Sequence, residues 1–175
     1  MKGLTFSLLF VLIAVAGFLR SSATKEQTKQ VASLGTTQTT GIRKERYLVT
    51  HVIDGDTIQI EGGEKVRYIG IDTPETVHPS KAIQCFGKEA SRYNSELVMG
   101  KLVTLVKDIS DTDKYGRLLR YVYIGDEFVN LTLVQNGYAY ATSFPPDIAH
   151  AANFRRAENT AREAKKGLWS SCPAR

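Results

Sequence analysis

Short segments rich in β-branched and aromatic residues alternate with turn residues through the middle of the chain, a pattern typical of β-strands. The Gly62-Gly63 pair between two of these segments is a signal for a hairpin turn. The pattern predicts five strands, at Arg46–Ile53, Thr57–Glu61, Lys65–Ile71, Lys101–Lys107 and Arg117–Ile124.

Three other segments have apolar residues at every third or fourth position, which is the period of an amphipathic helix. Phe86–Met99 has this spacing. A short helix is expected from a cap residue at Asn130 to Gly137, and a longer one from a cap residue at Asp147 to Gly167. Five short strands with three helices predict an α+β fold, mainly β, and most economically a five-stranded OB-fold barrel.

The N-terminal segment has a different pattern from the rest of the chain. Lys2 precedes an apolar run of 16 residues, 4–19, which is typical of a secretory signal peptide and shorter than a transmembrane helix of about 20. Arg20 is unfavourable for cleavage, so a membrane anchor formed by residues 4–19 is the alternative to a secreted protein. We therefore expect a signal peptide or anchor at 1–23, a flexible Thr-, Gln- and Ser-rich linker at 24–44 and a folded domain at 45–172.

The positive charge is concentrated at the N-terminus and says little about the partner of the folded part. The chain of 175 residues has a formal charge of +5. Residues 1–44 contain six basic residues and one acidic residue, whereas residues 45–175 contain 17 of each. The two cysteines exclude a disulfide-dense miniprotein and a zinc site of three or four thiolates. One apolar run excludes a membrane protein with several spans.

Two acidic motifs carry the candidate chemistry. Asp54 and Asp56 are two positions apart, so an extended chain places both carboxylates on one side, where oxygen ligands attract a hard cation. A DTPE sequence begins at Asp72, and its proline favours an extended Thr73. That geometry can present the Asp72 carboxylate and the Thr73 carbonyl to one centre, with Glu75 beyond them as a base. In isolation, each motif is more typical of an ordinary turn.

Two arginines are candidate phosphate ligands. Arg67 lies within the third expected strand and Arg117 begins the fifth. A guanidinium group suits phosphate because it offers forked donors and keeps its charge. For either arginine taken alone, a surface charge on a half-exposed strand is the favoured explanation. Arg67 and Asp72 are five positions apart, so strict alternation places them on opposite faces unless Gly70 marks a bulge.

Seven blocks of sequence, taken together, point to a known protein family. They are VIDGDT at 52–57, the Arg67-to-Asp72 spacing, DTPET at 72–76, FGKEAS at 86–91, DKYGR at 113–117, VN..LV..G at 129–137 and GLW at 167–169. In this order they resemble the staphylococcal-type thermonuclease family over about residues 46–170. The resemblance implies a five-stranded OB barrel with three helices that hydrolyses DNA and RNA with Ca²⁺ and leaves 3′-phosphates.

The resemblance also implies a calcium site. Asp56, Asp72 and the carbonyl of Thr73 would bind the ion, and Asp54 would stand beside these ligands and act through them. Three protein oxygens leave room for water and substrate on calcium, which accepts six to eight ligands.

The catalytic residues follow in the same way. Glu75 matches the general base, and Arg67 and Arg117 match the two arginines that bind phosphate. We expect Arg117 to stabilise charge rather than to donate a proton, because a guanidinium group hardly deprotonates.

The aromatic and cysteine positions are less closely tied to the family. Tyr115 is expected to contact substrate, and Tyr140 and Phe144 are the candidates to replace tyrosines that the family has after the position of Gly137. Cys85 and Cys172 are absent from the staphylococcal pattern and would form a disulfide outside the cytoplasm. In the chain-entropy description, that loop constrains the unfolded chain by about 4–5 kcal/mol.

The expected protein is a monomer that takes DNA and RNA as substrates. The alternative is a non-catalytic OB-type module that binds nucleic acid or protein without cutting. Glu75, Arg67 and Arg117 are all present, which argues against the alternative, because degenerate domains of this kind lose the base or an arginine. A third possibility is a calcium-binding surface protein with no nucleic-acid partner.

Overall fold

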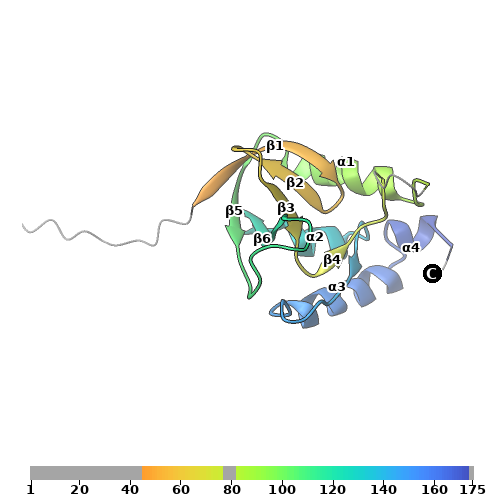
Figure 1. Cartoon of the computed structure of the whole chain (residues 1–175). Coiled ribbons are helices and arrows are strands. Elements are labelled where there is room, and N and C mark those ends of the chain that lie inside the picture. Colours follow the sequence, from red (N-terminus) through yellow and green to blue (C-terminus); the bar gives the residue numbers. More distant parts are fainter. Residues whose placement is uncertain (1–44, 77–81, 174–175) are drawn as a thin grey trace, which may run out of the picture. The chain divides into compact units, whose positions relative to one another are not determined.

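The computed structural model describes residues 45–76 and 82–173, and all of them belong to one compact unit. The expected leader at 1–23 and linker at 24–44 lie outside the described residues. Within the described ranges, no helix has the length and apolar character that a bilayer crossing requires. Figure 1 shows the elements of this part of the chain.

Five strands form a closed barrel, which confirms the predicted fold class. They pair in the order β3-β2-β1-β5-β6, and the pairing of β3 with β6 closes the ring. This closing pair is parallel, with Val66 opposite Leu118, whereas the other neighbours are antiparallel. The five strands are β1 (Arg46–Asp54), β2 (Thr57–Ile60), β3 (Lys65–Tyr68), β5 (Leu102–Val106) and β6 (Leu118–Ile124).

The third expected strand is interrupted at Gly70. β3 ends at Tyr68, and the chain continues after Gly70 as β4 (Ile71–Asp72), which pairs with β8 (Tyr140–Ala141) instead of a barrel strand. The φ of Gly70 is +80°, a conformation that glycine adopts without a steric penalty. Gly70 therefore turns the chain out of the barrel directly before Asp72.

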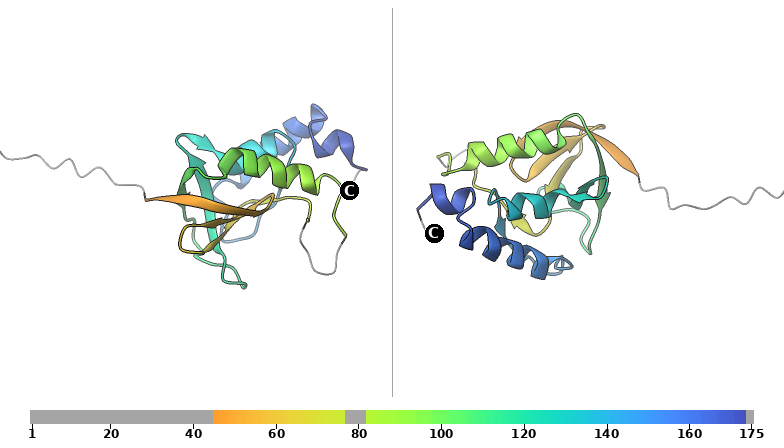
Figure 2. Two further views of the ribbon diagram at one scale, coloured as in Figure 1. Left: turned by 90° about the horizontal axis from the view of Figure 1, so that it is seen from above. Right: turned by 180° about the vertical axis from the view of Figure 1, so that it is seen from behind.

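The helices pack on the outside of the barrel. α1 contacts β1, and α2 lies between α1 and α3, as the right-hand view of Figure 2 shows. The three longer helices are the predicted ones, but a short fourth helix at the C-terminal end was not predicted. The helices are α1 (Gly87–Val98), α2 (Val129–Gln135, directly after strand β7, Glu127–Phe128), α3 (Ala151–Glu163) and α4 (Leu168–Ser171).

Asn130 does not cap α2, so this prediction is wrong. The helix begins one residue earlier, and the Asn130 side chain is buried. Its oxygen accepts a hydrogen bond from the Val122 N–H (2.9 Å), and its amide group donates to the Ile69 carbonyl (2.9 Å). Val122 lies within β6 and Ile69 directly after β3, so the polar side chain joins α2 to the barrel and satisfies both backbone groups.

Asp147 does not cap α3 either. The helix begins at Ala151, and the Asp147 carboxylate accepts hydrogen bonds from the N–H groups of Ile109 (2.9 Å) and Ser110 (2.8 Å). Burial alone would raise the pKa of Asp147, but these hydrogen bonds lower it below its usual value. The carboxylate thus fixes the segment between β5 and β6.

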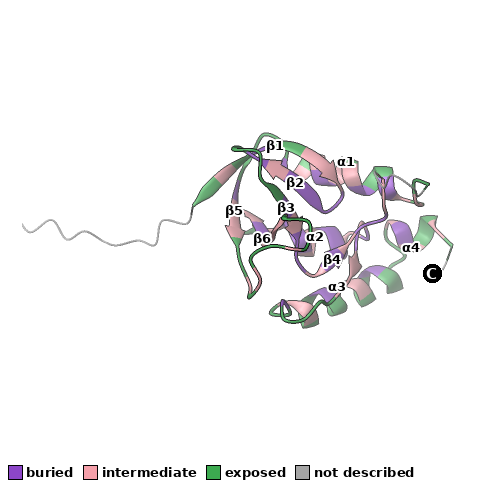
Figure 3. Cartoon of the chain, in the orientation of Figure 1, coloured by how far each residue is buried: buried purple, intermediate pink, exposed green. Residues whose placement is uncertain are grey.

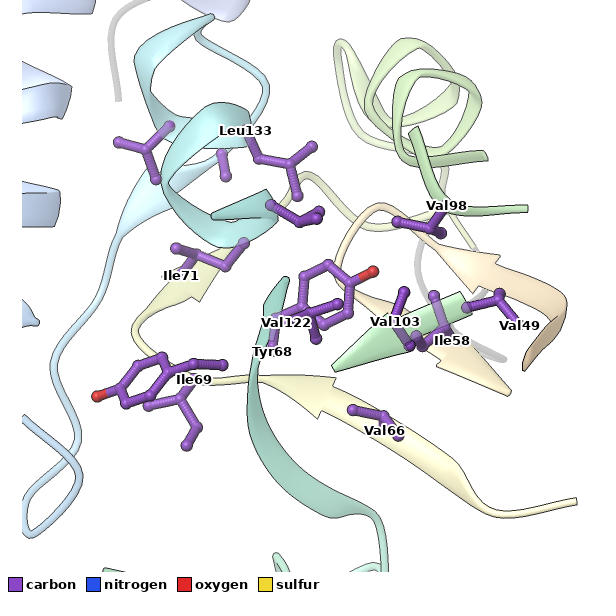
Figure 4. Close-up of a cluster of buried hydrophobic side chains, with 14 of the residues drawn as sticks. Val49, Ile58, Val66, Tyr68, Ile69, Ile71, Val98, Val103, Val122 and Leu133 are labelled. Carbon is purple, nitrogen blue, oxygen red and sulfur yellow. The ribbon is translucent and has the colours of Figure 1, made fainter. Parts of the chain in front are cut away.

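One hydrophobic core fills the barrel and the space beneath α1 and α2. Figure 3 shows the buried residues between the strands and helices and the exposed ones on the outer faces. Figure 4 shows Tyr68 at the centre of this core, near Val122 and Ile71. Tyr68 is 1% exposed, and its hydroxyl donates to the side-chain oxygen of Asn94 (3.0 Å). The buried faces of β3 therefore fix the strand that carries Arg67.

A disulfide joins Cys85 to Cys172, the pairing expected from the sequence. It links the residues just before α1 to the end of α4, across 87 positions of sequence. α4 is itself fixed to the fold, because Leu168 is buried and its N–H donates to the Gly137 carbonyl (2.9 Å).

Replacing Gly70 with alanine should destabilise the protein strongly. An added Cβ would collide with the ring of Phe154, and the positive φ would add backbone strain. We expect a loss of about 2–4 kcal/mol in the free energy of unfolding, measured by urea denaturation. Gly125→Ala is the matched control, since Gly125 has a φ of +58° but open space around its Cβ position. Equal losses in both variants would contradict the packing argument.

Asp147→Asn should destabilise the protein in a pH-dependent way. A carboxylate whose pKa is lowered by folding stabilises the protein above its unfolded-state pKa of about 3.9 and loses this effect as the pH falls through the folded-state value. We expect a loss of about 1–3 kcal/mol at pH 7 that shrinks toward pH 2. Urea denaturation of both proteins across this range measures it, and a loss independent of pH would refute the account.

Candidate active site

The turn between β1 and β2 carries the first acidic motif. The Asp54 carboxylate accepts a hydrogen bond from the Asp56 N–H (3.0 Å), which gives the turn a fixed shape. Asn94 of α1 donates to the Asp54 carbonyl (3.1 Å) and holds the turn from the core side. A Cβ at Gly55 would lie 2.7 Å from the Thr73 hydroxyl, so the second acidic motif packs directly on this turn.

Asp56 joins the two acidic motifs. Its carboxylate is 4% exposed and accepts hydrogen bonds from both the N–H (2.8 Å) and the hydroxyl (3.0 Å) of Thr73, 17 positions away. Two donors on one buried oxygen satisfy a charge that would otherwise be costly to bury. The residues around Thr73 are thereby held against the β1–β2 turn.

Arg67 bridges the same two motifs. Its guanidinium forms ion pairs with Asp56 and with Asp72 (3.0 Å), and it also donates to the Ile71 carbonyl (3.3 Å). Of the two alternatives for Arg67 and Asp72, the second holds: Gly70 has a positive φ and redirects the chain, so the two side chains meet in spite of their odd spacing. Burial lowers the pKa of Arg67, whereas Asp72 and Asp54 oppose this shift.

Several charged side chains of the site shift the pKa of Asp54. Burial raises its pKa, and Glu75 adds to the rise, whereas Arg67, the hydrogen bond from Thr57 and Arg117 lower it. Acidic and basic side chains from β1, β3 and two later segments therefore lie close enough to influence one carboxyl group. This is the electrostatic signature of a shared site.

Arg117 is held by the carboxylate of Asp113, to which the sequence analysis assigned no role. Its Nε and terminal nitrogen both lie 2.7 Å from the Asp113 carboxylate. Burial alone would raise the pKa of Asp113, but hydrogen bonds from the side chain and N–H of Arg117 and from the Tyr115 N–H lower it. The four-residue spacing of Asp113 and Arg117 was the available signal. A longer hydrogen bond (3.5 Å) connects Arg117 to the Thr57 hydroxyl.

Glu75 is half-buried and follows the segment that Asp56 holds. The Glu75 N–H donates to the side-chain oxygen of Gln84 (3.1 Å), and the Gln84 N–H donates to the Glu75 carbonyl (2.9 Å). The Glu75 carboxylate accepts from the Thr76 N–H (3.0 Å). Sequence reasoning missed Gln84, because nothing in its residue type or spacing predicts a contact with Glu75.

A cavity of about 520 Å³ opens beside the two arginines. Arg67, Arg117, Tyr115 and Phe144 all line it, and the last two are 72% and 66% exposed. The ring of Tyr115 lies 5.5 Å from the Arg117 guanidinium. Two of the three predicted aromatic contacts therefore border the cavity. Tyr140 does not line it, and its ring lies 5.3 Å from that of Trp169.

Two of the ligands expected for calcium, the carboxylates of Asp56 and Asp72, lie close together. Both form an ion pair with the guanidinium of Arg67, so the two carboxylates already share one positive charge. Within 45–76 and 82–173 there is no group of three or more His, Cys, Asp or Glu side chains that could hold a metal. The expected set needs only two carboxylates and the Thr73 carbonyl. Its hard oxygen donors suit Ca²⁺.

Comparison with known proteins shows the family of this chain. Residues 65–171 match the family model described as staphylococcal nuclease homologue. The chain is 41% identical to the thermonuclease of Staphylococcus intermedius over 133 residues, which are 74% of this chain and 79% of the relative.

Two further relatives have similar names. The thermonuclease of Staphylococcus hyicus is 34% identical over 174 residues, which are 98% of this chain and all of the relative. Endonuclease YncB of Bacillus subtilis is 43% identical over 123 residues, 67% of this chain and 58% of that protein. With a family model matching more than half of its length, the chain belongs to the staphylococcal nuclease family and is a nuclease, a hydrolase that acts on nucleic acid.

Proposed function

We propose that this nuclease is a Ca²⁺-dependent endonuclease that hydrolyses phosphodiester bonds of DNA and RNA and leaves 3′-phosphates. The observation that carries the proposal is the convergence of Asp56, Asp72 and Arg67. Asp56 binds the Thr73 backbone and hydroxyl, and Arg67 contacts both carboxylates. Two acidic motifs and a cationic side chain that can bind phosphate thereby form one site.

Arg67 and Arg117 bind the scissile phosphate in this proposal. Both line the cavity, so a phosphate placed there meets forked donors from two sides. These permanent charges offset the negative charge that builds on phosphorus as water attacks. Asp113 keeps the Arg117 fork oriented, and the exposed rings of Tyr115 and Phe144 offer surfaces for stacking bases.

Glu75 acts as the general base. It accepts a proton from the water that attacks phosphorus in line with the leaving oxygen, a contribution of typically about 10²–10⁴-fold. The hydrogen bonds of its backbone to Gln84 fix the position of the Cα atom from which the side chain extends. Asp54 lies within electrostatic range of Glu75 and of both arginines.

Asp56, Asp72 and the Thr73 carbonyl would hold Ca²⁺, with Asp54 acting through them. When bound, the ion supplies positive charge against the phosphate oxygens. The carboxylates that now share Arg67 are the ones that would share the ion, so the site already accommodates a cation between them.

The proposal includes export of the protein, with residues 1–23 as the signal peptide. The alternative is attachment to the membrane by residues 4–19. The Cys85–Cys172 disulfide supports export, because such bonds persist in oxidising compartments. The exported nuclease acts as a monomer.

Glu75→Gln should reduce cleavage without unfolding the protein. With the full chain, labelled single-stranded DNA and Ca²⁺, we expect the rate to fall about 10²–10⁴-fold, because the amide cannot accept the proton.

Arg117→Ala should reduce the cleavage rate about 10²–10³-fold in the same assay by removing a charge that stabilises the transition state. Excess chelator should stop the wild-type enzyme, and end-group analysis should find 3′-phosphates.

Arg155→Ala is the matched control for the arginine, because Arg155 is exposed on α3 away from the cavity. It should cleave at the wild-type rate. Circular dichroism confirms that each variant is folded. Cleavage that continues in chelator, or a Glu75→Gln protein as fast as the wild type, would overturn the proposed function.

Calcium should raise the thermal unfolding midpoint of the wild type and not that of Asp72→Asn. An ion that binds only the folded state stabilises it by about 2.7 kcal/mol at a concentration 100 times its dissociation constant. Scanning calorimetry of the full chain with Ca²⁺ or chelator measures the shift. Asp126→Asn, an exposed turn residue, is the control and should respond like the wild type. A calcium shift that survives Asp72→Asn would place the ion elsewhere.

A further inference from the structure

Gln84 holds both backbone polar groups of Glu75. Its side-chain oxygen accepts from the Glu75 N–H (3.1 Å), and its own N–H donates to the Glu75 carbonyl (2.9 Å). Gly87, the first residue of α1, packs directly against the same carbonyl group, because a Cβ at this position would lie 2.9 Å from the Glu75 carbonyl oxygen. The backbone of Glu75 is thus fixed to the segment that precedes α1.

That segment is fixed in turn by the disulfide. Cys85 directly follows Gln84 and is bonded to Cys172 at the end of α4. α4 is anchored by the buried Leu168, whose N–H donates to the Gly137 carbonyl (2.9 Å). A covalent connection therefore runs from an anchored C-terminal helix to the residue that holds Glu75.

The chain around Glu75 is held at two points. Asp56 fixes the chain at Thr73 through two hydrogen bonds, two positions before Glu75. The backbone of Glu75 itself is hydrogen-bonded to Gln84. A general base must reach its water with well-defined geometry, and a displacement of about 1 Å can reduce a rate about 10²-fold.

We propose that Gln84 is a positioning residue for Glu75 and that the Cys85–Cys172 disulfide, by anchoring Gln84, makes the cleavage rate sensitive to thiol reductants. The inference rests on the proposed role of Glu75 as base. In the redox step a dithiol reductant gives two electrons and two protons to the disulfide. The two cysteines become thiols, and the reductant becomes a cyclic disulfide.

Steady-state cleavage by the full chain tests Gln84 directly. Gln84→Met keeps the length of the side chain but removes the oxygen that accepts from Glu75, so kcat should fall about 10- to 100-fold while KM changes less than about twofold. Gln84→Glu restores an acceptor oxygen and should recover kcat relative to Gln84→Met. Wild-type kcat in Gln84→Met would overturn the positioning role.

Reduction tests the disulfide. Treatment with dithiothreitol, with the two free thiols counted by alkylation and mass spectrometry, should lower kcat with little change in KM at a temperature where circular dichroism shows a folded protein. Cys85→Ser combined with Cys172→Ser should start from this lowered kcat and should not respond to the reductant. Unchanged kcat in fully reduced, folded protein would overturn the redox part.

The Glu75→Gln background separates this inference from the proposed function. If Glu75 is the base, its variant is slow, and neither Gln84→Met nor reduction should lower the residual rate further. If Glu75→Gln is slow but both changes still lower its rate as much as in the wild type, Gln84 acts on the fold and the inference fails alone. If Glu75→Gln cleaves normally, the proposed function fails.

Discussion

The contact of Asp56 with Thr73 is the interaction on which the rest of the site depends. It brings together two turns that are 17 positions apart, and it does so through a carboxylate that is almost fully buried. It holds the chain after β4 against the β1–β2 turn, beside the pair formed by Asp72 and Arg67. A buried charge that is fully hydrogen-bonded favours one arrangement strongly, because every alternative leaves it unsatisfied.

The barrel supplies the rigidity that this contact needs. β3 is buried on both sides of Arg67, at Val66 and Tyr68, so the guanidinium starts from a fixed backbone. Gly70 then turns the chain outward, so that Arg67 and Asp72 meet in spite of their odd spacing. Family membership, a cavity beside two arginines and two carboxylates on one guanidinium are independent features that agree on phosphodiester hydrolysis.

Features that depend on period and local motif could be predicted from the sequence. The five barrel strands follow from runs of β-branched and aromatic residues between turn residues, and the three longer helices follow from apolar residues at every third or fourth position. The acidic turns follow from ordered motifs. Predictions that depended on tertiary partners failed. Asn130 and Asp147 have the residue types of helix caps, but their side chains instead accept hydrogen bonds from the N–H groups of β6 and of the β5–β6 segment, respectively. The contact of Gln84 with Glu75 arises where separate segments meet, which no local pattern encodes. The contact of Asp113 with Arg117 spans only four positions, and that spacing was its only signal.

The most direct measurement of the central claim is a crystal structure of the full chain with Ca²⁺ and a dinucleotide whose phosphodiester resists cleavage. Anomalous diffraction locates the calcium independently of the fitted atoms. We expect one calcium bound by Asp56, Asp72 and the Thr73 carbonyl, with the phosphate in contact with Arg67 and Arg117 and a water between phosphorus and Glu75. Calcium away from these two carboxylates, or a phosphate that touches neither arginine, would contradict the account.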